Sequence, residues 1–204
     1  MRKLILILLF IPLFSLHGFS KKHLLKGKII NVKDTTVVTF IIPINFFTKI
    51  PVYETIQHRI KYYDSDSTKK TITPEIATEI QFTYEREKVR MVSMANTLGL
   101  KQPMNRYSNN IFFKLEVEGY LSLYRYFHSK SFNGPNNSSY TYKSSSYFFQ
   151  KKGEQLTSLL YIGYKTYFSD CPQLIQKKKS KEFKWQDIDL VVKFYNENCA
   201  PEQN

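Results

Sequence analysis

The sequence has 204 residues, a formal net charge of +13 and 42% hydrophobic residues, which is enough apolar material for one ordinary folded domain. This composition excludes a disordered chain, and seven glycines leave little material for phosphate-binding loops. The sequence contains no P-loop, no nucleophile elbow and no Cys/His cluster with metal-ligand spacing. It therefore predicts no catalytic residue, no cofactor and no metal site.

The N-terminal segment 1–20 has the three parts of a secretory signal peptide. Two basic residues precede the apolar run 4–16, and the small residues Gly18 and Ser20 then fit a cleavage site before Lys21. A helix of this run spans about 20 Å, which is shorter than the ~30 Å hydrocarbon core of a bilayer. We expect cleavage near Ser20, which leaves a mature charge of +11; the alternative is an uncleaved N-terminal anchor.

From residue 24 to about 156, short runs rich in β-branched and aromatic residues alternate with turn signals, a pattern typical of antiparallel strands. The expected strands are 24–32, 36–42, 58–63, 69–73, 79–84, 88–94, 111–118, 120–127 and 140–150. In 111–118, Lys114 and Glu116 alternate with apolar residues, which predicts a half-buried strand with these charges on its wet face. The polar segment 129–139 predicts a loop.

Around residue 157 the apolar period changes to that of helices. The first expected stripe consists of Leu160, Tyr164, Tyr167 and Phe168. A second short helix is expected to begin at Pro172, since proline suits a first helical position, and a third to run from about Trp185 to Cys199. The predicted fold is α+β: an antiparallel sheet, curled or barrel-like, over residues 21–156, then a helical tail over 157–199 and a flexible C-terminus over 200–204.

Two cysteines, Cys171 and Cys199, lie in the mature chain. Cys171 precedes the second expected helix and Cys199 ends the third, so an antiparallel helix hairpin would bring the two residues together. An even cysteine count in an exported protein favours a disulfide, and two unpaired buried thiols are the alternative.

A run of lysines marks the helical tail. It consists of Lys177, Lys178, Lys179, Lys181 and Lys184. One interpretation is a patch that binds an anionic glycan or lipid headgroup. The other is that the lysines solvate a helix end, as such runs commonly do. No specific nucleic-acid partner is expected.

The C-terminal third resembles a family of exported Bacteroidota proteins. Residues 168–174 read FSDCPQL, and residues 187–196 read DIDLVVKFYN, which are similar to the family patterns F-x-D-C-P-x-L and D-[IL]-x-x-[IV]-V-x-x-Y-N. Residues 113–124 and 72–82 resemble upstream segments of the same family. The resemblance implies a β-rich region followed by a short helical tail in the bacterial envelope, and it supplies no catalytic residues.

Three functional hypotheses follow. The leading one is a non-catalytic periplasmic or secreted protein with a binding or accessory role at the cell envelope. The second is an enzyme whose site is assembled from dispersed residues on the sheet. The third is a basic module for anionic glycans or lipid headgroups. A pocket with convergent His, Asp or Glu would favour the enzyme, and an aromatic or basic face would favour a binding module.

Overall fold

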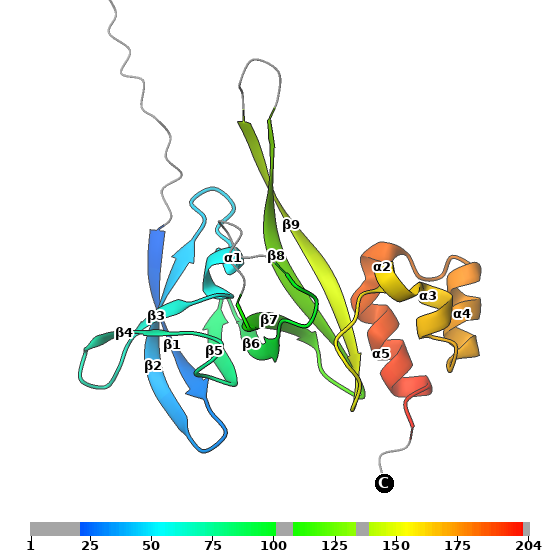
Figure 1. The fold of residues 1–204 in the computed structure, drawn as a ribbon, viewed down its shortest axis with the longest axis horizontal. Helices are drawn as coiled ribbons and strands as arrows, with labels where there is room; N and C mark the ends of the chain where they lie inside the picture. The colour runs from blue at the N-terminus through cyan, green and yellow to red at the C-terminus, as the bar shows by residue number, and fades with distance from the viewer. Residues whose placement is uncertain (1–20, 101–107, 134–138, 202–204) are drawn as a thin grey trace, which may run out of the picture.

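Nine antiparallel strands form one open sheet in the computed structural model, which describes residues 21–100, 108–133 and 139–201. The strand order is β4-β3-β2-β1-β5-β6-β7-β8-β9, so β4 and β9 are its edges (Figure 1). The α+β prediction, with an antiparallel sheet and a small helical unit after it, is confirmed. Because the two edge strands do not pair, the barrel-like alternative is wrong.

The elements have the following bounds. The strands are β1 (Lys21–Ile30), β2 (Thr35–Ile44), β3 (Ile60–Tyr63), β4 (Lys69–Ile72), β5 (Glu79–Tyr84), β6 (Glu87–Ala95), β7 (Asn110–Val117), β8 (Leu121–Asn133) and β9 (Ser139–Lys151). The helices are α1 (Tyr53–Ile56), α2 (Leu159–Ile162), α3 (Tyr164–Tyr167), α4 (Pro172–Lys179) and α5 (Ile188–Asn198), with a 3₁₀ turn at Trp185–Asp187 before α5.

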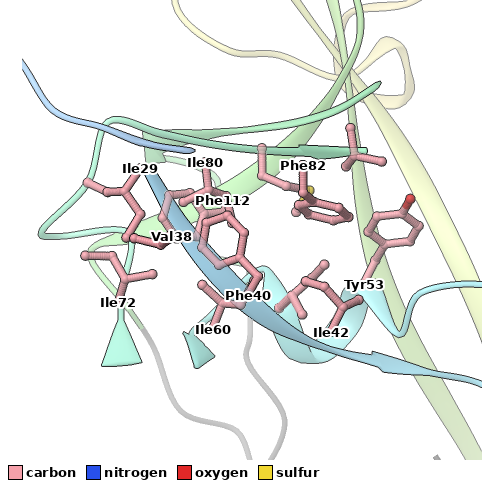
Figure 2. Packing of buried hydrophobic residues seen from close by; sticks show 14 of the residues in the cluster. Ile29, Val38, Phe40, Ile42, Tyr53, Ile60, Ile72, Ile80, Phe82 and Phe112 are labelled. Atoms are coloured by element: carbon pink, nitrogen blue, oxygen red, sulfur yellow. The ribbon is translucent and has the colours of Figure 1, made fainter. Parts of the chain in front are cut away.

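The N-terminal half of the sheet curls around the first hydrophobic core (Figure 2). In β2 every second side chain from Val38 to Ile44 is buried, which is the period-two pattern of a strand with one apolar face. The short helix α1, which the sequence did not predict, closes this core with Tyr53 and Ile56. Phe112 of β7 also enters it, and so joins the two halves of the sheet.

The C-terminal half of the sheet is covered by the helical tail. Leu121 and Leu123 of β8 pack with α4 and α5 in a second core, while Tyr124 and Tyr126 face a third core on the opposite side. Figure 1 shows α2 to α5 gathered beside the ends of β8 and β9. The tail is therefore docked on one face of the β8–β9 hairpin.

Two predictions about local structure are wrong. Of the expected loop 129–139, residues 129–133 continue β8 and Ser139 begins β9, with Ser129 paired opposite Lys143, while residues 134–138 lie outside the described part of the chain. A paired hairpin satisfies its backbone groups without needing apolar side chains. The expected single stripe from Leu160 is two one-turn helices separated at Gly163 (φ +82°), and Leu160 itself is 90% exposed.

Candidate functional site

A pocket of about 500 Å³ lies between the loop after β2 and strands β7 to β9. Helix α1 and the β5–β6 turn complete its walls. The lining residues are Asn45, Thr48, Ile50, Pro51, Tyr53, Glu54, Tyr84, Glu85, Glu87, Lys114, Arg125, Phe127, Lys143 and Ser144. Its volume lies within the usual range of small-molecule sites.

The loop that forms one wall is held in shape by its own hydrogen bonds. The Asn45 side-chain oxygen accepts hydrogen bonds from the backbone N–H groups of Phe47 and Thr48, both at 2.9 Å, as in an Asx turn. The Tyr84 hydroxyl of β5 donates to the Lys49 carbonyl at 2.5 Å. These hydrogen bonds hold the loop in place, so this wall of the pocket is formed without a ligand.

Aromatic rings line the inner side of the pocket. Tyr53 and Phe127 stack with their ring centres 4.5 Å apart and their planes 18° apart. Burial, reinforced by the charges of Glu87 and Glu116, raises the pKa of the Tyr53 hydroxyl well above its ordinary value. Tyr53 therefore stays protonated at neutral pH and can donate a hydrogen bond.

Charged side chains converge on the same pocket in compensated pairs. The Lys114 ammonium lies 2.7 Å from a Glu87 oxygen and 3.1 Å from a Glu116 oxygen, and Lys143 lies 3.1 Å from Glu54. Among the lining residues there are three cationic and three anionic side chains, so their formal charges cancel. A protein with a large positive charge thus carries a neutral pocket.

Lys114 departs from its predicted position. The sequence placed it on the wet face of a half-buried strand, but its side chain is only 9% exposed. It lies below the pocket, with its ammonium 5.5 Å from the Tyr53 ring centre. Two carboxylates compensate the cost of burying this charge, and nothing in the alternating pattern of β7 showed that they would be near.

Arg125 of β8 spans the pocket wall between two rings. Its guanidinium carbon lies 5.0 Å from the centre of Phe127 and 5.4 Å from that of Tyr147. Its Nε donates to the Ser145 hydroxyl at 3.0 Å. A guanidinium nitrogen also lies 3.6 Å from a Glu116 oxygen, and the five N–H donors of the guanidinium exceed these contacts.

Three glutamates, Glu54, Glu85 and Glu87, line the pocket, and two of them are paired with lysines. The lining residues include no histidine or cysteine, and the described parts of the chain hold no group of three or more metal-ligating side chains. The nearest histidine in sequence to α1, His58, is turned into the structure beside Gln57, and burial lowers its pKa to about 4. His58 is therefore neutral at physiological pH.

The predicted lysine run lies at the far end of the molecule from this pocket, where α4 ends. Lys177 forms an ion pair with Glu182 at 2.5 Å, and the Lys178 ammonium lies 4.7 Å from the Tyr164 ring centre. Lys179, Lys181 and Lys184 are exposed. The first three lysines of the run occupy the last turn of α4, where positive charge favours the helix dipole, so the solvated-helix-end interpretation accounts for their placement.

The two cysteines lie at disulfide distance, with Cα atoms 5.5 Å apart. Cys171 directly precedes α4 and Cys199 directly follows α5, as the helix-hairpin prediction expected.

A partly buried polar cluster adjoins the cysteine pair. The Asp170 carboxylate accepts hydrogen bonds from the Lys151 ammonium at 2.7 Å and from the Tyr195 hydroxyl at 2.6 Å. The Asn196 amide pairs with both the N–H and the carbonyl of Leu121, at 2.8 and 2.9 Å. These contacts explain the FSDCPQL and YN motifs as residues that attach the tail to the sheet.

Comparisons with protein-family models, with curated proteins and with solved structures find no match for this chain. In the portion that the structure describes, no helix has the length and apolar character needed to cross a membrane.

Proposed function

We propose that this chain is an exported, non-catalytic binding protein of the bacterial envelope, and that its ligand is a neutral saccharide held in the pocket behind the loop after β2. The single observation that carries this proposal is the charge balance of the pocket. Glu54 and Glu87 have lysine partners, and the three cationic and three anionic side chains of the lining balance, so the pocket favours a ligand without net charge.

The chemistry of the walls agrees with a saccharide. The apolar face of a sugar ring packs on aromatic side chains, and Tyr84 is a half-buried lining ring that can take this role, while Tyr53 and Phe127 stack on each other. Sugar hydroxyls both donate and accept, and they form strong hydrogen bonds with ionised groups. Arg125 of β8 offers hydrogen-bond donors and Glu54 of α1 offers acceptors, so the pocket can donate to sugar hydroxyls and accept from them.

The test is calorimetric titration of the mature protein with neutral oligosaccharides, using tetramers of N-acetylglucosamine, glucose and galactose. We expect one of these probes to bind, and Arg125→Met to weaken that binding by about tenfold, since one charged hydrogen bond is lost. Arg90→Met is the matched control, because Arg90, like Arg125, is an arginine on a strand. Arg90 pairs with Glu79 and Glu118 and does not line the pocket.

The outcomes separate the hypotheses. Binding that survives Arg125→Met, or an absence of binding to all three probes, contradicts the saccharide site. Release of shortened sugars from a bound probe would instead favour the enzyme hypothesis. Export has its own check: the mass of the secreted chain should correspond to a protein that begins at Lys21.

A further inference from the structure

The outer face of the N-terminal half of the sheet is strongly basic. Successive strand residues point to opposite faces, and Phe40, Ile29 and Ile80 face the core, so the residues between them face outward. The register places Lys26 beside Thr39, and Ile41 beside Lys61. This outer lysine face contains Lys22, Lys26, Lys28, Lys61, Lys69 and Lys88.

Carboxylates are scarce beside these six lysines: the Glu79 carboxylate interacts electrostatically with Lys88. All six are exposed, and none forms an ion pair with any residue that the structure describes. Among the outward residues of β1 to β6, the one carboxylate is Glu79, and it is bonded to Arg90 at 2.6 Å. The face therefore presents a positive field toward solvent, in contrast to the neutral pocket.

The densest part of the face is a shallow groove of about 310 Å³ where β1, β2, β5 and β6 meet. Lys26, Lys28 and Lys88 line it, together with Gln81 and Thr83. Neighbouring strands lie about 4.8 Å apart and alternate residues about 6.8 Å apart, so the three ammonium groups cover an area that phosphate groups on a surface could contact together.

Two exposed aliphatic side chains stand among the lysines. Leu24 is 63% exposed and Val37 is 64% exposed, each with lysines as neighbours on β1. A soluble polyanion offers nothing to such side chains, whereas the boundary between headgroups and acyl chains does. The lysines also extend over β1, β3, β4 and β6, which forms a two-dimensional array and suits a surface better than a single linear polymer.

We infer that the outer lysine face docks this protein on an anionic lipid surface, with headgroup phosphates against Lys26, Lys28 and Lys88 and with Leu24 at the acyl boundary. This contact is separate from the saccharide proposal, because the pocket opens on the other side of the sheet. Tyr84 lines the pocket from the inner face of β5, while its neighbour Thr83 lies on the outer face.

The test is co-sedimentation of the mature protein with vesicles of phosphatidylglycerol and phosphatidylethanolamine, and with vesicles of phosphatidylcholine alone. We expect binding to the anionic vesicles only, weakening as salt is added. The triple variant Lys26→Gln, Lys28→Gln, Lys88→Gln should bind about a hundredfold more weakly. The control triple Lys177→Gln, Lys179→Gln, Lys181→Gln removes the same charge from the helical tail and should retain binding within a few fold.

Further arms distinguish a lipid surface from a soluble anion. Leu24→Ser should weaken vesicle binding and leave any binding to soluble polyphosphate unchanged. The inference is overturned if the protein does not bind the anionic vesicles, or if both lysine triples weaken vesicle binding equally. It is also overturned if the protein binds polyphosphate through Lys26, Lys28 and Lys88 but does not bind the vesicles.

Discussion

At the scale of single residues, the buried Lys151 ammonium helps to attach the helical tail to the sheet. The Lys151 side chain is only 9% exposed, and its ammonium donates to Asp170 and to the Tyr167 carbonyl. A buried ammonium that loses its carboxylate partner remains costly, because it has neither water nor a counter-charge. Asp170 therefore supplies the counter-charge that the Lys151 ammonium needs.

Asp170→Asn should lower the free energy of unfolding at neutral pH by about 1 kcal/mol, because the lost hydrogen bonds to a charged group are partly screened by solvent at the 48% exposed Asp170 side chain. Burial acts to raise the pKa of Asp170, but the hydrogen bonds from Lys151 and Tyr195 outweigh it and lower the pKa below 3.8. The stability from this carboxylate is thus present above 3.8 and is lost as pH falls through the lower folded pKa.

Urea denaturation at neutral pH and below pH 3.8 measures this difference, which should shrink in acid. Asp189→Asn is the control, since Asp189 faces Lys193 at 3.5 Å with both side chains about half exposed, and such surface pairs contribute little. Equal effects of the two variants at neutral pH would contradict a specific role for Asp170.

At the scale of elements, the turn of the β5–β6 hairpin has residues that do not suit its backbone conformation. Its two turn residues, Glu85 and Arg86, have φ of +46° and +72°, a left-handed conformation that side chains disfavour. Tyr84 pairs with Glu87, so the loop is the two-residue kind that prefers Asn-Gly.

Replacing Glu85 and Arg86 with Asn and Gly should raise the free energy of unfolding by about 1 kcal/mol, because the turn strain is relieved. Thermal and urea unfolding measure the gain. Alanine at both positions keeps the strained φ angles and should give no gain. A stabilisation by the alanine pair as large as that by Asn-Gly would show that the charges, rather than the backbone, are responsible.

Much of this element-level structure could be predicted from sequence. Runs rich in β-branched and aromatic residues located β2 and β5, alternation of apolar and charged residues located β7, and Pro172 marked the start of α4. The pattern failed where polar residues interrupt the apolar periodicity, as at the end of β8 and the start of β9. It failed again at Gly163, where a single backbone break divides an apparently continuous helical stripe.

At the scale of the whole molecule, the pocket could not be predicted. Its residues come from α1, the loop after β2, and strands β5 to β9, which only the curl of the sheet brings together. The outer lysine face was missed for the same reason, since its lysines are isolated in sequence. The tail lysines were conspicuous because they are consecutive, although a helix end explains them well.

The molecule has separate cores under the N-terminal strands and under the tail, so the cysteine pair should stabilise mainly the tail. Cys171 and Cys199 are 28 residues apart, and a bridge closing such a loop contributes about 3 to 4 kcal/mol by restricting the unfolded chain. Replacing both with alanine, or reducing the wild type, should therefore speed hydrogen exchange of the α4 and α5 amides before those of β1 and β2. If a reductant does not change hydrogen exchange in the wild type and both thiols can be alkylated, the cysteine pair is not oxidised. If exchange becomes faster evenly over β1 and α5, the two cores are not separate.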